Sequence, residues 1–398
     1  MEPVRRDRVL LATAVFAVLF AQVLLYPGVP DLVAALGATT AALDASTWFL
    51  GIEFAGFVLA AGLWGVASDA AGRRVPFIAA GAVGGAAGYL ALGLAPRAID
   101  ASFGLVLVLR FLQGAATIGA FSLAMTMLMD LPAGHGRNMG AAGIAIGLGT
   151  AMGAPVGGRL TTIDPLFPLF VAAGMLLVVA IVVSRVRDRA PDPDRSGLGD
   201  VVRRLAAQPP LGIPFAFGFI DRLTAGFFAL VGTLYFRTVF ELDAAATGLV
   251  LALFFAPFAL LQYPFGVISD RIGRATPVVG GSAFYGVALT AVGLAPALEL
   301  AAGLMVVVGI LGALMAPATM ALVTDLAGSG ERGAAMAGFN IAGSIGFFVG
   351  IVLGGTIASV LGFRPAFLAI GALEVGLAVI ALPFLLRLDL DTTATFSG

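Results

Sequence analysis

Two charged residues interrupt long apolar stretches in the first half of the sequence. Glu53 stands in the stretch 46–67, and Arg110 stands in the stretch 103–129. If both stretches are membrane helices, each residue lies about 10 Å below the same end of its helix, at about 1.5 Å per residue. An arginine inside such a helix is costly unless it has a partner or reaches water. We hypothesise that Glu53 is a protonatable carboxyl, and that Arg110 or a bound cation competes with its proton.

Two other interpretations of this pair stay open. Glu53 and Arg110 would form a static ion pair that holds two helices together, or the Glu53 side chain would extend to the outer surface. Only the first hypothesis connects the pair with proton transfer. Replacement of Glu53 by glutamine would test it directly.

A short polar motif occurs once in each half of the sequence. Each copy follows one long apolar stretch and precedes another, which predicts a tight hairpin between two membrane helices. Glycines allow the chain to turn, and an acid and an arginine four residues apart can bond each other. Two copies predict two halves that are built alike. The residues are Gly65, Asp69, Gly72 and Arg73 in the first copy and Gly266, Asp270, Gly273 and Arg274 in the second.

The duplication continues two apolar stretches later. Asp130 and Arg137 follow the fourth stretch, and Asp325 and Arg332 follow the tenth at the same spacing. Each half therefore places a further acid and arginine on the same side of the membrane as its hairpin.

The composition indicates the class of protein that must position these residues. Of 398 residues, 60% are hydrophobic and 11% are charged, and the mean hydropathy is +1.05. We therefore expect an all-α membrane protein. There is no cysteine, which excludes disulfides and thiol-ligated metals, and the net charge of -1 gives no reason to expect nucleic acid.

The sequence shows no pattern typical of an active site. A nucleophile with a base, a cluster of metal ligands and a phosphate-binding loop are all missing from it. We therefore expect neither an enzyme nor a cofactor or metal site.

Twelve apolar stretches are long enough to cross a membrane at about 20 residues per span. The longest polar interruption separates six stretches from six. It predicts an N-terminal six-helix bundle over 1–185, a cytoplasmic linker over 186–212 and a C-terminal six-helix bundle over 213–398. Within the linker, 198–207 would be an amphipathic surface helix or a solvated segment. The predicted spans are 9–27, 46–67, 76–95, 103–129, 140–160, 167–185, 213–236, 245–267, 277–294, 299–324, 335–360 and 366–386.

Arginine placement predicts the orientation, because basic residues near span ends are retained on the cytoplasmic side. With both termini in the cytoplasm, sixteen of the 22 basic residues lie in cytoplasmic segments and four in outer loops. We expect a multi-pass protein of a plasma (inner) membrane with both termini cytoplasmic. Twelve spans suffice for a monomer, which we expect in contact with the lipid bilayer.

The repeated hairpin in a chain of twelve spans resembles the major facilitator superfamily of transporters, whose halves are related by internal repeats. The resemblance covers the whole chain. Gly-x-x-x-Asp-x-x-Gly-Arg after the second span is the signature of that family. The resemblance implies that two bundles move about a central site and that the hairpins act as latches, or gates, on the cytoplasmic side. The alternative is that the hairpins are ordinary charged loops that fix the topology.

The resemblance also implies partners for the gate residues. Asp69 and Arg73 would pair with each other and with Asp130 or the start of the eleventh helix. In the second half, Asp270, Arg274 and Asp325 would mirror this arrangement.

Two further spans resemble motifs of the family. The fourth span resembles the motif whose arginine, here Arg110, is tied to proton coupling. The fifth span resembles the motif of exporters that exchange drug for proton, with its proline one place late. Small residues at four-residue spacing also predict a flat helix face for close packing. The residues of this antiporter-like helix are Gly149, Gly153, Pro155, Gly157 and Gly158.

Few polar residues remain inside the spans for a substrate to contact. The candidates are Gln22, Gln113, Asp221, Arg222, Tyr235 and Asn340. Asp221 and Arg222 could instead form a structural pair, and the glutamines and the asparagine could link helices. Glu374 in the twelfth span is a similar case. Few polar and many aromatic residues favour a lipophilic or cationic compound over a sugar.

These observations predict a secondary transporter that works by alternating access. Proton-coupled export of lipophilic or cationic small molecules fits them best, with the substrate and protons as partners. An importer or facilitator of a small anionic metabolite, with Arg110 and Arg222 as anion contacts, is the alternative. A membrane receptor or scaffold without transport is a remote third interpretation.

Overall fold

Helices make up most of the described chain. The computed structural model describes residues 3–98, 102–132, 135–189, 203, 208–327 and 332–396, and these residues include no β-strand. Among the described residues, ten helices are long and apolar enough to cross a membrane, and Phe167–Val183 is a shorter apolar helix. The predicted all-α membrane class is confirmed. The two interpretations of the segment 198–207 lie outside the described residues, apart from residue 203.

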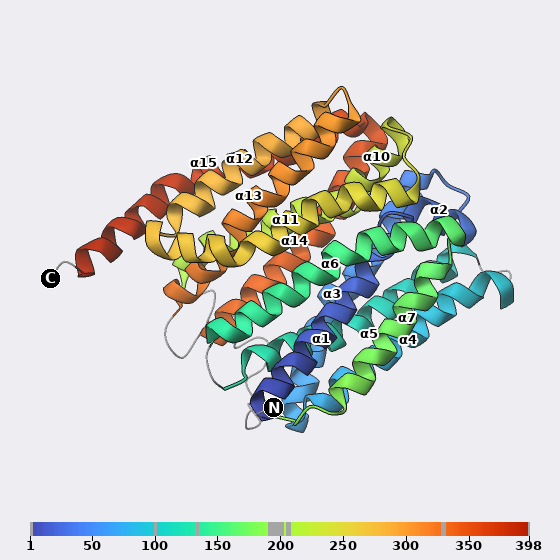
Figure 1. The fold of residues 1–398 in the computed structure, drawn as a ribbon, viewed down its shortest axis with the longest axis horizontal. Helices are drawn as coiled ribbons and strands as arrows, with labels where there is room; N and C mark the ends of the chain where they lie inside the picture. Colours follow the sequence, from blue (N-terminus) through green and yellow to red (C-terminus); the bar gives the residue numbers. More distant parts are fainter. Residues whose placement is uncertain are drawn as a thin grey trace. The chain divides into compact units, whose positions relative to one another are not determined.

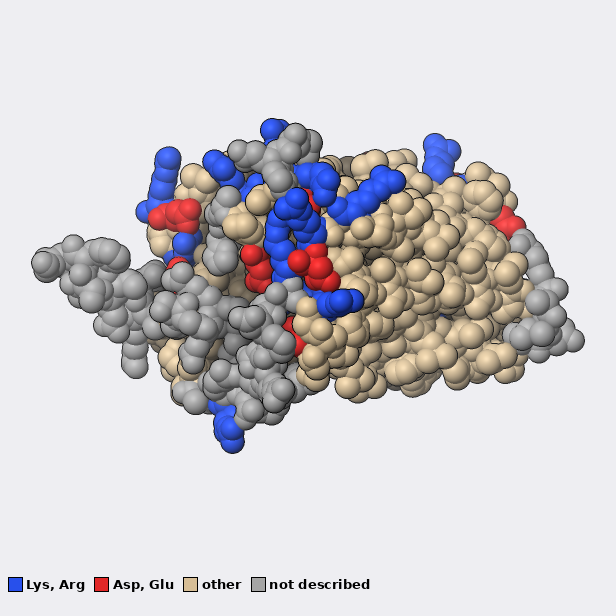
Figure 2. All heavy atoms as spheres, turned by 90° about the horizontal axis from the view of Figure 1, so that it is seen from below, with Lys and Arg blue, Asp and Glu red and all other residues tan. Residues whose placement is uncertain are grey.

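Large apolar side chains are exposed over much of the surface. Leu63, Leu260 and Val360, for example, are 67%, 73% and 74% exposed. In the space-filling view, the acidic and basic side chains gather in a few places and leave a wide uncharged surface between them (Figure 2). In a lipid bilayer this surface needs no further cover, whereas in water it would drive association.

The chain forms two compact units. Unit 1 comprises Met1–Leu198 and Gly232–Ala252, and unit 2 comprises Gly199–Val231 and Leu253–Gly398. The segment Gly232–Ala252 therefore groups with unit 1, although it follows the linker in the sequence.

Unit 1 contains the helices of the first half of the chain and a short part of the second. Its main packing pairs are α4 with α5, α3 with α5, α1 with α6 and α4 with α7. The helices are α1 (Pro3–Val23), α2 (Val29–Ala35), α3 (Ala42–Ala71), α4 (Val75–Ala98), α5 (Phe103–Met129), α6 (His135–Ile163), α7 (Phe167–Val183), α10 (Thr233–Val239) and the first residues of α11 (Ala244–Ile272) (Figure 1).

Unit 2 contains the rest of the second half. Its main packing pairs are α9 with α14, α12 with α15 and α12 with α13. Its elements are the 3-10 helix η1 (Pro209–Leu211), α9 (Gly212–Phe227), the π-helical turn η2 (Phe228–Gly232), which ends at the border with unit 1, the remainder of α11, α12 (Ala275–Leu294), α13 (Leu298–Leu326), α14 (Arg332–Leu361) and α15 (Phe363–Phe396).

The two units repeat one packing pattern. The pairs α1 with α6, α4 with α7 and α4 with α5 correspond to α9 with α14, α12 with α15 and α12 with α13. In each half these are the first and fifth, third and sixth, and third and fourth predicted spans. The duplication seen in the hairpins therefore extends to helix packing.

Glycines of α6 form the face on which α1 packs. A Cβ added at Gly149 would lie 2.8 Å from the carbonyl oxygen of Phe16, and one at Gly153 would lie 3.0 Å from that of Phe20. Gly157 is so close to the backbone of Leu24, directly after α1, that no Cβ would fit there. The flat face predicted for the fifth span thus brings two backbones together.

Two other features of this packing stand out. Gly158 faces the backbone of Ala244 at the start of α11 rather than α1, and Pro155 lies inside α6. In unit 2, Gly350 of α14 lies directly against the backbone of Leu223 on α9. Close backbone contact between the first and fifth spans therefore occurs in both halves.

Two predicted spans differ from the structure. The span predicted over 9–27 ends as a helix at Val23, and the separate short helix α2 begins at Val29, beyond the predicted range. The seventh span, 213–236, consists of α9, the π-helical turn Phe228–Gly232 and α10. Such turns often occur near functional positions in membrane and soluble helices.

Candidate functional site

Glu53 and Arg110 meet in the interior of unit 1. Glu53 lies on α3 and Arg110 on α5, two helices that pack together. Nη2 of Arg110 donates to Oε2 of Glu53 at 2.5 Å, and both side chains are fully buried. Gly114 permits this approach, because a Cβ added there would lie 2.5 Å from the carbonyl oxygen of Glu53. Arg110 thus has the partner that its depth in the span suggested.

A chain of hydrogen bonds continues from Arg110 along α5. Nη1 of Arg110 donates to Oε1 of Gln113 at 2.6 Å, and Nε2 of Gln113 donates to the hydroxyl of Thr117 at 2.8 Å. Gln113 is fully buried, so both ends of its amide serve this chain. The sequence had suggested a substrate contact for Gln113, whereas its position in the structure supports Arg110.

Two aromatic rings face the guanidinium of Arg110. Its Cζ atom lies 4.6 Å from the ring centre of Phe49 on α3 and 5.5 Å from that of Tyr89 on α4. Cation–π contacts of this kind contribute about 0.5–2 kcal/mol each. Arg110 therefore has neutral partners in addition to the carboxylate.

Sequence reasoning missed Phe49, Tyr89 and Thr117. Of these three, only Thr117 could have been found from the sequence, because it follows Gln113 by four residues and so lies on the same helix face.

Two polar atoms of the buried pair have no hydrogen-bond partner among the described residues. They are Oε1 of Glu53 and Nε of Arg110. Buried polar atoms are rarely left unpaired, and the exceptions often mark a functional site. Oε1 is the carboxyl oxygen at which a proton can bind without meeting an existing hydrogen bond.

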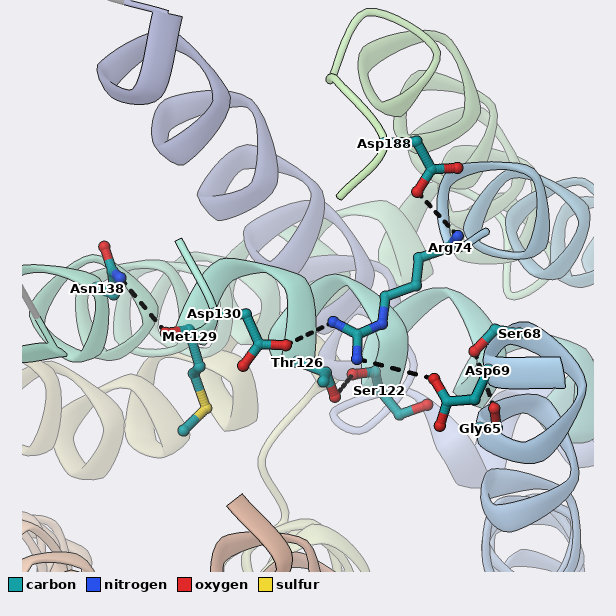
Figure 3. A network of polar contacts seen from close by, with 10 residues as sticks. All are labelled: Gly65, Ser68, Asp69, Arg74, Ser122, Thr126, Met129, Asp130, Asn138 and Asp188. Atoms are coloured by element: carbon teal, nitrogen blue, oxygen red, sulfur yellow. Dashed lines mark hydrogen bonds and ion pairs between the residues drawn. The ribbon is translucent and has the colours of Figure 1, made fainter. Parts of the chain in front are cut away.

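An arginine of the first hairpin connects two acids (Figure 3). Nη1 of Arg74 lies 2.5 Å from Oδ2 of Asp130, and Nη2 lies 3.8 Å from Oδ1 of Asp69. Arg74 is 5% exposed. Arg73, by contrast, is exposed and forms no ion pair with another residue in the described part of the chain.

This arrangement corrects the expectation that Arg73 pairs with the acids. Gly72 ends α3 in the left-handed conformation with a φ of 61°, which a glycine adopts at little cost. Arg74 stands directly before Val75, the first residue of α4. The arginine next to the start of the helix therefore reaches the acids, and its neighbour faces outward.

Asp188, just after α7, holds the start of α4. Its Oδ1 accepts from the backbone N–H of Arg74 at 3.0 Å (Figure 3). Its Oδ2 accepts from the backbone N–H of Val75 at 3.3 Å. Arg189, the next residue, lies 2.9 Å from the buried carboxylate of Asp7 on α1. Sequence reasoning missed Asp188, because nothing in a polar segment indicates which helix start it meets.

The second hairpin has the expected pairs. Nη1 of Arg274 lies 2.5 Å from Oδ1 of Asp270, and Nε lies 3.1 Å from Oδ2 of Asp325. Partial burial alone would lower the pKa of Arg274, but the hydrogen bonds to both acids raise it above its usual value. Here too the pairing arginine stands directly before a helix, which begins at Ala275. In both hairpins the pairing arginine is the residue directly before the next helix. The two pairing arginines, Arg74 and Arg274, do not occupy equivalent positions in the repeated motif.

The glycines of the hairpins have different roles. Gly273, like Gly72, is left-handed, with a φ of 87°. A Cβ at Gly65 would meet nothing within 4 Å, and one at Gly266 would lie 3.7 Å from Pro317. Sterics in each unit therefore explain the glycine at the turn but not the glycine one turn before the acid.

The other candidate substrate residues are spread over both units. Gln22 on α1 and Tyr235 on α10 lie in unit 1 and are buried. Asp221 and Arg222 on α9 and Asn340 on α14 lie in unit 2, where Arg222 and Asn340 are exposed. A substrate site made from them remains a proposal.

A family model matches nearly the whole chain. The model describes the Major Facilitator Superfamily, and it matches residues 11–240 and 214–395. The chain belongs to this superfamily. The superfamily consists of transporters, so this membership indicates a transporter rather than an enzyme.

Relatives of this transporter match parts of the chain. It is 31% identical over 170 residues to an uncharacterized MFS-type transporter of Methanocaldococcus jannaschii, over 41% of this chain and 42% of that protein. It is 32% identical over 130 residues to the inner membrane transport protein YajR of Escherichia coli, over 32% of this chain and 28% of that protein. Each match spans less than half of the relative's length.

Solved structures share the fold over nearly the whole chain. A bacterial homolog of the human lysosomal transporter Spinster has a TM-score of 0.78 at 16% identity, over 97% of this chain and 98% of that one. The human organic anion transporter MFSD10 has a TM-score of 0.71 at 20% identity, over 95% and 99%. A D-xylose-proton symporter has a TM-score of 0.73 at 15% identity, over 94% and 96%. The expected major facilitator fold is confirmed.

Proposed function

We propose that this transporter exports lipophilic or cationic small molecules in exchange for protons, and that Glu53 carries the proton. The observation that carries this proposal is the buried pair of Glu53 and Arg110, in which Oε1 of Glu53 has no hydrogen-bond partner among the described residues. A carboxylate held by an arginine can exchange that interaction for a proton. Protonation would therefore change the interaction between Glu53 on α3 and Arg110 on α5.

Arg110 keeps other partners when Glu53 is protonated. Removing the only partner of a buried charge costs about 3–5 kcal/mol, which would oppose protonation. The hydrogen bond to Gln113 and the rings of Phe49 and Tyr89 stay in place and reduce that cost. The cluster is therefore suited to alternate between two charge states.

Two features support lipophilic export. The face of α6 around Gly153 and Pro155 resembles the motif of drug:proton exporters. Aromatic rings stack within each unit, Phe16 on Phe20 in unit 1 and Phe228 on Phe254 in unit 2, with centroids 5.7 Å apart in both pairs. A site for a sugar would instead require many paired polar groups.

The arginine distribution supports the orientation that this mechanism needs. We place the transporter in the plasma (inner) membrane with both termini in the cytoplasm, because basic residues gather on that side. The moving bodies would be the six-helix bundles 1–185 and 213–398, joined by the linker 186–212, within a single monomer.

A second candidate is an importer or facilitator of a small anionic metabolite. The exposed guanidinium of Arg222 on α9 favours it, because an arginine within a membrane helix can bind an anion. One structure with the same fold is that of a human organic anion transporter. This candidate needs no proton on Glu53.

Transport in lipid vesicles tests both candidates. The purified chain is placed in vesicles with an imposed pH gradient and a pH-sensitive dye, and lipophilic cations or small organic acids are added. Wild type is compared with Glu53→Gln and with Glu299→Gln, whose carboxylate is exposed in the first turn of α13. We expect lipophilic cations to collapse the gradient with wild type and Glu299→Gln but not with Glu53→Gln.

Other outcomes would overturn the proposal in distinct ways. Collapse by organic acids would favour the anionic metabolite. Unchanged coupling in Glu53→Gln would make the buried pair structural. A gradient that no compound disturbs would indicate an uncoupled facilitator.

A further inference from the structure

A second fully buried carboxyl lies in unit 2. Glu374 of α15 is 0% exposed. Its Oε1 accepts from the hydroxyl of Thr224 on α9 at 2.8 Å, and its Oε2 accepts from the hydroxyl of Ser282 on α12 at 2.7 Å. Gly286 lets α12 pack closely against α15, because a Cβ added at Gly286 would lie 2.8 Å from the Cβ of Glu374. Three helices thus meet at one carboxyl group.

No cation balances this carboxyl in the described part of the chain. Neither an arginine nor a histidine there donates to Glu374 or forms an ion pair with it. On α9, Asp221 stands three residues before Thr224 and so lies on the same face, with Arg222 next to it. Asp221 is an acid, and a second negative charge nearby would oppose ionisation of Glu374 rather than favour it.

In the part of the chain that the structure describes, the remaining helices place no further charged side chain in an ion pair or hydrogen bond with Glu374. On α12, Tyr285 follows Ser282 by three residues and is buried. On α14, which also packs against α15, no titratable residue occurs from 338 to 361. On α15 itself, Arg364 lies ten positions before Glu374, at the start of the helix.

The hydroxyl partners of Glu374 differ in kind from the arginine partner of Glu53. A guanidinium can only donate hydrogen bonds, whereas a hydroxyl both donates and accepts. Thr224 or Ser282 can therefore accept the proton of a carboxylic acid and donate to a backbone carbonyl of its own helix. Burying the ionised form of a carboxyl group costs several kcal/mol of desolvation free energy. When its only hydrogen-bond donors are neutral, most of that cost is not recovered.

We propose that Glu374 is a second proton-binding site of this transporter, occupied at neutral pH by one proton that it shares with the hydroxyls of Thr224 and Ser282. Binding takes one proton from solvent and neutralises one negative charge inside unit 2. The two buried glutamates then differ in charge, Glu53 being ionised beside an arginine and Glu374 neutral between hydroxyls. The site does not depend on the role proposed for Glu53.

Infrared spectroscopy of the purified chain tests this site without any transport assay. A protonated carboxyl has a carbonyl stretch that is separate from the bands of a carboxylate and shifts in D₂O. At neutral pH we expect this band in wild type, in Glu53→Gln and in Glu299→Gln, and its loss in Glu374→Gln. A band that survives in Glu374→Gln, or a wild type with carboxylate bands only, would overturn the proposal.

A second variant keeps the test decisive if Glu374→Gln does not fold. Ser282→Ala retains the carboxyl and removes one hydroxyl partner, so the same band should move to higher frequency as a hydrogen bond is lost. A band that stays in place would show that the protonated group lies elsewhere. Because the readout is spectroscopic, loss of proton-coupled transport through Glu53 would not be mistaken for failure at Glu374.

Discussion

Arg73 and Arg74 are neighbours in the sequence with opposite environments. Arg73 is exposed, whereas Arg74 is almost fully buried between Asp69 and Asp130. An exposed ion pair contributes about 0–1 kcal/mol, whereas removing one partner of a buried pair costs more. Asp188 also binds the backbone at Arg74. A single residue therefore connects the hairpin, the end of α5 and the segment after α7.

Alanine substitutions at positions 73 and 74 test whether the buried arginine matters for transport and the exposed one does not. We expect Arg74→Ala to lower the transport rate in vesicles at least several-fold, because Asp69 and Asp130 lose their common cation. Arg73→Ala should transport at nearly the wild-type rate. Each variant removes one positive charge from the same loop, so equal effects of the two would show that the net charge of the loop matters and the pairing does not.

The sequence could predict which acids meet an arginine but not which arginine. The resemblance to the family implied that the hairpin with Asp69 and Gly72 lies beside Asp130, at the end of the fourth span. The choice between Arg73 and Arg74 depends on the residue at which α4 begins, and helix ends are uncertain by one or two residues. Glu53 and Arg110 could be matched by depth alone. Phe49 and Tyr89 could not, because depth does not reveal which helices lie beside each other.

The two halves of the chain resemble each other most closely in which of their helices pack together. The first and fifth spans of each half meet through glycines placed against a backbone, as at Gly157 on Leu24 and at Gly350 on Leu223. Such contacts substitute for the hydrophobic effect, which does not drive helices together in lipid. The spacing of small residues predicted this packing on α6. The π-helical turn before α10 left no comparable pattern in the sequence.

An added methyl group tests the packing of α1 on α6. We expect Gly157→Ala to destabilise the protein by about 1–3 kcal/mol, because the methyl group would overlap the backbone of Leu24. Gly174→Ala on α7 is the matched control, since nothing lies within 4 Å of its added Cβ. Thermal unfolding of the purified variants measures both. A midpoint for Gly157→Ala equal to that of Gly174→Ala would contradict the close contact.

At the scale of the whole chain, a segment that follows the linker is built into unit 1. Nη2 of Arg237 on α10 lies 2.7 Å from Oδ1 of Asp31 on α2. The pair borders a groove of about 390 Å³ that Thr161, Thr162 and Asp243 also line. Residues 206 positions apart in the chain thus form one ion pair. The pair therefore links α2 to α10 within unit 1.

A double-mutant cycle measures that energy. Asp31→Asn and Arg237→Gln each remove the pair, so the double variant should be no less stable than the less stable single variant. We expect a coupling of about 1 kcal/mol, because both side chains are partly exposed. Thermal unfolding of all four proteins provides the cycle. Strictly additive losses would mean that the two side chains act independently.

The outward-facing side chain of Arg73 has a practical consequence, because the chain contains no cysteine. A cysteine at position 73 would be the sole thiol of the molecule and would be open to a spin label or a fluorophore. The label would sit one residue from the arginine that bridges Asp69 and Asp130, without replacing it. Spectroscopy at this one position can therefore follow the hairpin in real time while the transporter works in a membrane.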